Sequence, residues 1–272
     1  MINFNGSFLD NSKAILFSNN RAFNYGDALF ETLKIENSKI NFLEDHYFRL
    51  MASMRMLRME IPMNFTMEFF EDELLKTAEE NKLENARVRF TVYRKEGGLY
   101  NPTSNQIDYL IVVSPLTVLV KDTYLVDIFK DYYLNSDILS SIKTTNKITN
   151  VLASIYASEN GLDNCILVNE RKQVVEAING NIFLVKGTKI ITPPISEGCI
   201  KGVIRKKILE IVLKSDSYTI EEVEISPFEL QKADEIFITN SIIGIQPITQ
   251  YKKYKFRTEV SKYLTQALSK LI

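Results

Sequence analysis

The chain of 272 residues is poor in the side chains that bind metals and form disulfides. It contains one histidine, His46, and two cysteines, Cys165 and Cys199, which do not have the close spacing of a metal-binding pair. Because protein zinc sites take three or four such ligands, a lone histidine cannot anchor one, and we expect no metal. The scarcity of cysteine also indicates a reducing compartment, so we expect a cytoplasmic protein.

Long apolar runs and an excess of one charge are also missing. The start, Met1-Ile2-Asn3-Phe4-Asn5-Gly6, lacks the basic region and apolar core of a signal peptide, and no later apolar run reaches membrane-spanning length. The 33 basic and 34 acidic residues give a formal net charge of −1, which creates no broad field for nucleic acid or anionic membranes. We therefore expect neither as a partner.

The remaining composition is that of a globular protein. Hydrophobic residues make up 45% and charged residues 25%, so a substantial core can form without disulfides. This length suits one large or two ordinary domains. Because Pro115 ends a strand-like run, we place the boundary near 115–125 and predict domains at 1–118 and 119–272.

Hydrophobic periodicity predicts mixed helices and strands throughout. In the first domain we predict strands near 14–17, 28–35, 87–94 and 108–113, helices near 43–58 and 66–81, and a turn-rich loop at 95–102. In the second we predict strands at 165–168, 174–178, 182–185, 190–191, 218–225 and 235–239, and helices at 147–160, 202–214 and 257–270. The pattern is that of an α/β fold of the α+β type, whose second half forms an antiparallel meander that can curve into a barrel.

Lys143 is the first candidate for chemistry, in the run Ile142-Lys143-Thr144-Thr145-Asn146, and Glu176 follows later in Val174-Val175-Glu176-Ala177-Ile178. Apolar surroundings lower the pKa of a lysine, so that the neutral amine can attack a carbonyl. A lysine on its own is far more often structural. The motifs around Lys143 favour a nucleophilic role.

Two segments of the second half could bind an anion. Gly202 precedes the helical pattern Val203-Ile204-Arg205, and free N–H groups at a helix start attract phosphate, although many ordinary helices begin after glycine. The run Thr239-Asn240-Ser241 ends a predicted strand and offers hydroxyl and amide donors, although simple turn chemistry explains it equally well.

Three further side chains are candidates in the first half. Arg49 can grip a phosphate with its guanidinium fork or can be an ordinary solvated helix residue. His46 lies one turn earlier and is more often structural than catalytic in such a position. Arg94 stands at a strand end and can capture a substrate carboxylate or be only surface charge.

Together these runs resemble the class IV aminotransferases, in the right order over nearly the whole chain. The runs that carry the resemblance are Arg21-Ala22-Phe23-Asn24-Tyr25-Gly26-Asp27-Ala28-Leu29-Phe30-Glu31-Thr32, the Lys143 and Glu176 runs with Asn181-Ile182-Phe183, Gly202-Val203-Ile204-Arg205 and Thr239-Asn240-Ser241. That family uses pyridoxal 5'-phosphate and has fold type IV. The resemblance implies a small α/β N-terminal lobe, a larger C-terminal lobe built on a barrel-like sheet, the cofactor between them, and a homodimer.

The resemblance also implies roles for individual residues. Lys143 is similar to the lysine that binds the cofactor covalently and moves protons at the substrate α-carbon. Glu176 resembles the carboxylate that pairs with the pyridine nitrogen and keeps it protonated. The positions implied for phosphate binding are Arg49, the backbone of Val203 and Ile204, and the Ser241 hydroxyl.

Differences from two branches of the family concern the substrate. Arg94 resembles the carboxylate-binding arginine of the D-amino-acid branch, where the other subunit supplies it, but no histidine follows it here. Phe30 stands where that branch has a carboxylate-binding tyrosine. Lys147 stands where branched-chain enzymes have a cofactor-contacting tyrosine, so both activities are in doubt.

The predicted activity is therefore amino-group transfer from an amino-acid-like substrate that carries a carboxylate. The alternative is aminodeoxychorismate lyase activity, which eliminates pyruvate and leaves 4-aminobenzoate, because Thr239-Asn240-Ser241 and the compact length resemble those lyases. A third possibility is a non-catalytic member, although such a protein would be free to lose Lys143 or Glu176.

Overall fold

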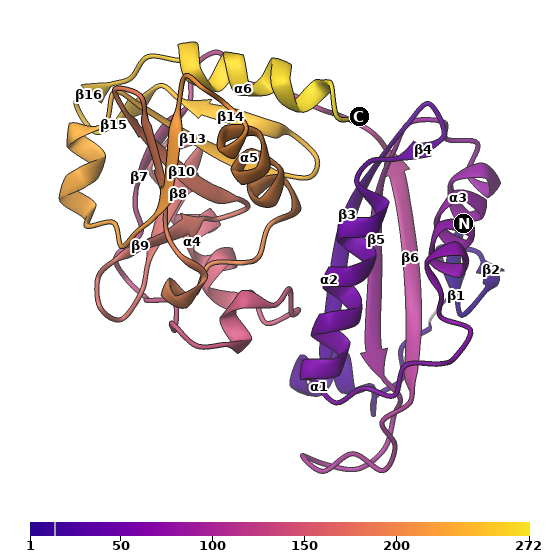
Figure 1. Cartoon of the computed structure of the whole chain (residues 1–272). Helices are drawn as coiled ribbons and strands as arrows, with labels where there is room; N and C mark the ends of the chain where they lie inside the picture. Colours follow the sequence, from indigo (N-terminus) through magenta and orange to yellow (C-terminus); the bar gives the residue numbers. More distant parts are fainter. Residues whose placement is uncertain (14) are drawn as a thin grey trace. The chain divides into compact units, whose positions relative to one another are not determined.

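The computed structural model describes residues 1–13 and 15–272, and it divides into two compact units (Figure 1). The first unit consists of Met1–Val118 together with Lys143–Asn146, and the second of Leu119–Ile142 together with Lys147–Ile272. Both units mix helices and strands, as predicted. The sequence prediction assigned Lys143 to the second domain, whereas its contacts group it with the first unit.

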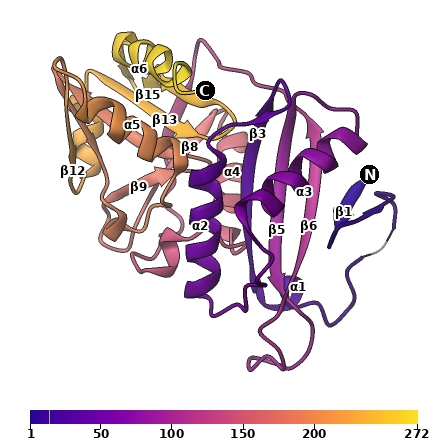
Figure 2. The same cartoon turned by 45° about the vertical axis from the view of Figure 1, so that its right-hand side comes forward.

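The first unit is built on one antiparallel sheet of six strands, in the order β2-β1-β6-β5-β3-β4. The strands are β1 (Ile2–Phe4), β2 (Ser7–Leu9), β3 (Ala28–Glu36), β4 (Lys39–Ile40), β5 (Ala86–Arg94) and β6 (Ile107–Pro115). The helices of this unit are α1 (Arg21–Tyr25), α2 (Leu43–Met56) and α3 (Met67–Glu80). Helices α2 and α3 cover one face of the sheet (Figures 1 and 2).

Aromatic packing shows which side chains of this sheet face the helices. The ring of Phe90 on β5 lies 4.9 Å from that of Phe70 on α3, measured between centroids. Glu31 on β3 pairs with Phe90 across the ladder, so it shares this covered face. Because side chains alternate along a strand, Phe30 and Arg89 lie on the opposite face.

The first half of β3 has an open edge, because its edge neighbour β4 pairs only with Ile35 and Glu36. The segment around Lys143 occupies that edge. The Phe30 N–H donates to the Lys143 carbonyl at 2.9 Å, and the Thr145 N–H donates to the Ala28 carbonyl at 3.1 Å. Lys143 is thus fixed through its backbone, next to an isolated antiparallel bridge between Leu29 and Thr144.

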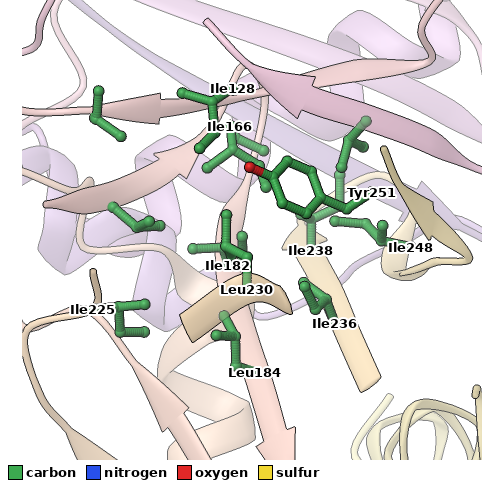
Figure 3. Packing of buried hydrophobic residues seen from close by; sticks show 14 of the residues in the cluster. Ile128, Ile166, Ile182, Leu184, Ile225, Leu230, Ile236, Ile238, Ile248 and Tyr251 are labelled. Atoms are coloured by element: carbon green, nitrogen blue, oxygen red, sulfur yellow. The ribbon is translucent and has the colours of Figure 1, made fainter. Parts of the chain in front are cut away.

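The second unit contains two five-stranded sheets, in the orders β12-β11-β10-β13-β14 and β16-β15-β7-β8-β9. The strands are β7 (Leu125–Ile128), β8 (Asn164–Val168), β9 (Val174–Ala177), β10 (Asn181–Lys186), β11 (Lys189–Thr192), β12 (Thr219–Glu222), β13 (Glu235–Asn240), β14 (Gly244–Ile248), β15 (Gln250–Tyr251) and β16 (Tyr254–Lys255). One core of isoleucine, leucine and valine is shared by both sheets, with Ile166 from one and Ile182 and Ile236 from the other (Figure 3). This shared core gives the barrel-like arrangement that was predicted.

Helices pack outside these sheets. Helix α4 (Ile148–Glu159) lies on β8, and Ala153 and Ala157 belong to the same buried cluster as Cys165 and Leu167. Helices α5 (Val203–Leu213) and α6 (Glu259–Ser269) lie on the β13 side. Short 3-10 helices cover Leu139–Ser141, Ile195–Glu197 and Pro227–Lys232. Across the described residues no helix is long and apolar enough to cross a bilayer.

Some sequence predictions of elements were wrong. The strand expected at 14–17 is not formed by Ile15, Leu16 and Phe17, and Ala14 lies outside the described residues. The strand expected at 218–225 ends at Glu222, although Ile225 is fully buried in the shared core. An apolar residue can therefore be buried without belonging to a ladder, which periodicity alone does not reveal.

Candidate functional site

The amine of Lys143 lies beside an aromatic ring and a second cation. Its Nζ is 4.4 Å from the centroid of the Phe30 ring, and the Cζ of Arg89 is 3.8 Å from the same centroid. Because both distances are measured to the same centroid, Lys143 Nζ and Arg89 Cζ cannot be farther apart than the sum of the two distances. Phe30 is buried, so its ring presents both cations with a preformed apolar surface.

Arg89 was not among the residues predicted from the sequence. It is partly buried, and this burial lowers the pKa of its guanidinium, as does the positive charge of Arg87. Within residues 1–13 and 15–272 it has no hydrogen-bonded or ion-paired partner, and the Phe30 ring is its contact. A partly desolvated guanidinium beside a candidate nucleophile is suited to an anionic substrate group.

Arg94, which was predicted to bind a substrate carboxylate, is committed to structural contacts. It is buried, and its Nε donates to Asp27 Oδ2 at 2.9 Å. Its other nitrogens donate to the Asn105 side chain and to the carbonyls of Leu57 and Arg58. These contacts give Arg94 a structural role within this unit, and its binding of a substrate carboxylate stays a prediction.

Buried Glu31 and His46 form a cluster with the partly buried Arg49 on the helix-covered face. The Arg49 Nε donates to Glu31 Oε1 at 2.7 Å, and its Nη2 donates to Glu31 Oε2. The Nδ1 of His46 lies 2.7 Å from the same Oε2. Arg49 and His46 are candidates on sequence grounds, whereas Glu31 is only part of the longer run from Arg21 to Thr32 there.

The charges within this cluster shift its pKa values. Burial alone would raise the pKa of Glu31, but the positive charge of Arg49 and the hydrogen bonds lower it to about 2. Burial lowers the pKa of His46 against the opposing effect of Glu31, so the imidazole is neutral near pH 7. Since Nδ1 donates to an ionised carboxylate, Nε2 carries the lone pair; it is buried and has no partner among the described residues.

In the second unit, Glu176 is a buried carboxylate on β9. Its exposed fraction is 6%, and its Oε2 accepts a hydrogen bond from the Ile200 N–H at 3.0 Å. Burial lowers the pKa of the nearby Lys147, and the negative charge of Glu176 partly offsets this effect. The carboxylate therefore lies within electrostatic range of a lysine that the sequence marked as a departure from branched-chain enzymes.

The start of α5 has the features of an anion site. Gly202 is its N-cap, and no side chain caps the first-turn N–H groups of Val203 and Ile204. A Cβ at Gly202 would lie 2.0 Å from the Asn181 Oδ1, so any larger residue there would have to displace the Asn181 side chain. The helix dipole and these N–H groups favour a negative charge at this end.

Thr239 and Ser241 lie near the end of β13. The Thr239 hydroxyl is buried and has no hydrogen-bond partner in the part of the chain that the structure describes. Thr239 pairs with Asn181, whose side chain also reaches the Ile200 carbonyl at 2.8 Å. The Asn240 side chain accepts from the N–H groups of Ile242 and Ile243, which shapes the turn around Ser241.

The arrangement gives each unit a distinct chemical function. The first holds an anchored amine with cations that can receive an anion, and the second holds a buried carboxylate with N–H and hydroxyl donors. The amine of the first unit can move protons, and the carboxylate and donors of the second unit can hold a cationic nitrogen and an anion.

Comparisons with known proteins agree with this chemistry. The model of the family described as "Amino-transferase class IV" matches residues 28–251. A Methanocaldococcus jannaschii protein, provisionally named a branched-chain-amino-acid aminotransferase, is 30% identical over 91% of this chain and 86% of its own. The aminodeoxychorismate lyase of Vibrio harveyi is 25% identical over 84% of each chain.

Solved structures show the same fold. The branched-chain aminotransferase of Thermoproteus uzoniensis, crystallised with norvaline, superposes with a TM-score of 0.91 at 22% identity, and the match covers 99% of this chain and 93% of that one. Another branched-chain amino acid aminotransferase, crystallised with pyridoxamine 5'-phosphate, superposes with a TM-score of 0.88 at 22% identity. That match covers 99% of this chain and 92% of the other.

Proposed function

This chain belongs to the class IV aminotransferase family, and we therefore propose that it is a pyridoxal-phosphate-dependent aminotransferase. Its substrate would be an amino compound that carries a carboxylate. The observation that carries the proposal is the anchored Lys143 amine, which shares the buried Phe30 ring with Arg89.

The described residues fit pyridoxal 5'-phosphate. No side chain caps the first turn of α5, and the buried hydroxyl of Thr239 has no partner among the described residues, so both offer donors to an incoming group. We assign phosphate binding to the Val203 and Ile204 N–H groups, the Ser241 hydroxyl and the Arg49 guanidinium. Glu176 would pair with the pyridine nitrogen, and Lys143 would hold the aldehyde carbon. When bound, the cofactor supplies a ring that withdraws electrons from the substrate α-carbon.

The chain's own residues would then bind and move protons. Lys143 Nζ takes the proton from the substrate α-carbon and returns a proton during transfer. Arg89 binds the substrate carboxylate, because it is an unpaired guanidinium, among the described residues, near that amine. Glu176 keeps a proton on the pyridine nitrogen by presenting its negative charge.

Covalent trapping tests the assignment of Lys143. Borohydride reduction of protein saturated with pyridoxal 5'-phosphate should fix one adduct, which peptide mass mapping should locate at Lys143. Lys143→Ala should abolish turnover and keep the fold, whereas Lys76→Ala, at an exposed lysine paired with Asp72, should change neither. An unlabelled Lys143, or full activity of Lys143→Ala, would refute the proposal.

Aminodeoxychorismate lyase activity is the second candidate, supported by the Vibrio harveyi relative and by the Thr239-Asn240-Ser241 run. A transaminase stores the amino group, so one amino acid without any acceptor should convert the bound aldehyde to the amine form. A lyase should release pyruvate from aminodeoxychorismate without any keto acid. Following pyruvate in that single mixture separates the two activities.

We further propose that the protein acts as a cytoplasmic homodimer. Its two cysteines, Cys165 and Cys199, are buried and unpaired, which suits a reducing compartment. Light scattering of the purified protein at micromolar concentration should give twice the mass of 31.3 kDa.

A further inference from the structure

We propose that Glu31, supported by His46, is a positioning residue that orients Arg49 toward the cofactor's phosphate. This inference rests on the proposed function, in which Arg49 is a phosphate ligand. It concerns two side chains that contact neither the substrate nor the cofactor in that proposal.

The geometry of the ion pair fixes the plane of the guanidinium. Glu31 accepts from Arg49 through both of its oxygens, at Nε and at Nη2, so the two planar groups meet edge to edge. A single contact would let a long arginine side chain swing about its bonds, whereas a two-point grip holds one orientation. The remaining nitrogen, Nη1, then points away from the carboxylate by the shape of the group itself.

His46 fixes the carboxylate in turn. Its Nδ1 lies 2.7 Å from the same Glu31 oxygen that Arg49 Nη2 uses, and both Glu31 and His46 side chains are about 1% exposed. Rotation of the carboxylate would therefore break contacts with two partners together. The three residues come from two elements, since Glu31 lies on β3 and the other two lie one turn apart on α2.

Stability alone does not account for this cluster. The free energy lost when a buried ion pair is desolvated is often as large as the free energy gained from its attraction. Apolar side chains of similar volume therefore often stabilise a fold equally well. The buried Nε2 of His46, which has no partner among the described residues, is a further cost. A cluster retained at this cost beside the anchored segment of Lys143 is better explained by control of Arg49.

Two hypotheses, that Glu31 only neutralises Arg49 or that it orients Arg49, make opposite predictions for Glu31→Gln. If Glu31 only neutralised Arg49, its removal would strengthen phosphate binding. If it orients Arg49, its removal should weaken phosphate binding and leave the rest of the cofactor's affinity unchanged.

The test compares two ligands that differ only by the phosphate. Apoprotein is titrated with pyridoxal 5'-phosphate and with pyridoxal, and the ratio of the two dissociation constants measures phosphate preference. Glu31→Gln should reduce this preference by about tenfold or more, the value of a lost charge-assisted hydrogen bond, while pyridoxal affinity stays constant. His46→Gln should reduce it by a smaller factor.

Matched variants separate positioning from general damage. Glu73→Gln removes a hydrogen-bonded carboxylate of the same unit, held by Asn3 and Tyr109, and should leave the preference unchanged. In an Arg49→Gln background, Glu31→Gln should have no further effect. If Glu31→Gln does not fold, Glu31→Asp keeps the charge but shortens the grip, and it should show the same loss.

Each remaining outcome decides between the two proposals. A wild-type protein without phosphate preference would overturn the phosphate role of Arg49 and this inference together. A wild-type preference that Glu31→Gln retains, or increases, would overturn the positioning role alone. Equal weakening of both ligands would also overturn it.

Discussion

At the scale of single residues, His46 stands out because it is the chain's only histidine and is fully buried. Most proteins mix several histidine titrations, so their effects on stability cannot be separated. Here any stability change that arises from a histidine belongs to His46.

Stability should fall as the pH drops below about 6.5, the ordinary histidine pKa. Burial lowers the pKa of His46 in the folded state, so the unfolded chain binds the proton first and gains from it. The pKa of Glu31 is also lowered, to about 2, so its contribution is present above its ordinary value of 4.5 and is lost only in stronger acid. The free energy of unfolding, measured with urea between pH 7 and 5, should change by at most about 1.4 kcal/mol per pH unit.

The control for this pH dependence is His46→Gln, which keeps a polar side chain without the titration. Its unfolding free energy should change much less over the same interval. Parallel slopes for the two proteins would contradict the assignment to His46.

A sequence can single out a residue when its own short run is distinctive, but not when its neighbours depend on how the strands pair. Lys143 and Glu176 stand out within their own short runs. Arg89 was not found, because alternation along β5 makes it look like any solvent-facing charge. Its position beside Phe30 follows from the pairing of β5 with β3, which the sequence does not reveal.

At the scale of elements, α5 begins after Gly202, where a larger residue would collide with a neighbouring side chain. The backbone of Gly202 has an ordinary φ of −65°, so its need for glycine comes from the close Asn181 side chain. Many glycines are instead required for a positive φ.

Gly202→Ala should destabilise the fold by about 1–3 kcal/mol, the typical cost of overpacking. The added methyl group would displace Asn181 and its hydrogen bond to the Ile200 carbonyl. Urea unfolding measures the loss, and adding Asn181→Ala should recover part of it. Strictly additive effects would show that the two sites do not touch.

Asp27 joins two elements through a shared carboxylate oxygen. Arg21 on α1 and Arg94 on β5 both donate to its Oδ2 at 2.9 Å. Arg21 also donates to the carbonyls of Gly97 and Leu99, so the same group holds the turn-rich loop.

Asp27→Asn should destabilise the protein by about 3 kcal/mol, because it leaves two buried guanidinium groups without their counter-charge. Thermal or urea unfolding measures this effect. Asp72→Asn removes an exposed partner of Lys76 and should have little effect. If Asp27→Asn lowered the free energy of unfolding as little as Asp72→Asn does, Asp27 would contribute only as an ordinary surface charge.

Long, periodic elements were predictable, whereas several of the shortest were not. Helix α3 was expected at 66–81 and spans Met67–Glu80, and β3 was expected at 28–35 and spans Ala28–Glu36. The five-residue α1 and the two-residue strands β15 and β16 were missed, since so few residues show no period. Their formation depends on partners elsewhere in the chain.

At the scale of the whole molecule, the near balance of charge has a measurable consequence. The formal net charge is −1 at pH 7, and the calculated isoelectric point is about 6.1. Proteins are least soluble where their net charge vanishes.

Solubility should therefore pass through a minimum near the isoelectric point of about 6.1, and added salt should change its depth. Turbidity measured across this pH region at fixed concentration checks the expectation. A minimum displaced by more than about one pH unit would show that folding shifts many carboxyl or amine pKa values.

The segment around Lys143, which pairs with the edge of β3, also limits how this protein can be shortened. A fragment that stops at Val118 would keep the six strands of the first unit but would lose the segment that pairs with Ala28 and Phe30. Its β3 would then present unpaired amide and carbonyl groups, which invite other chains to add a strand. Such a fragment should aggregate during expression, and an isolated first unit would need residues 143–146 to be grafted back onto its edge.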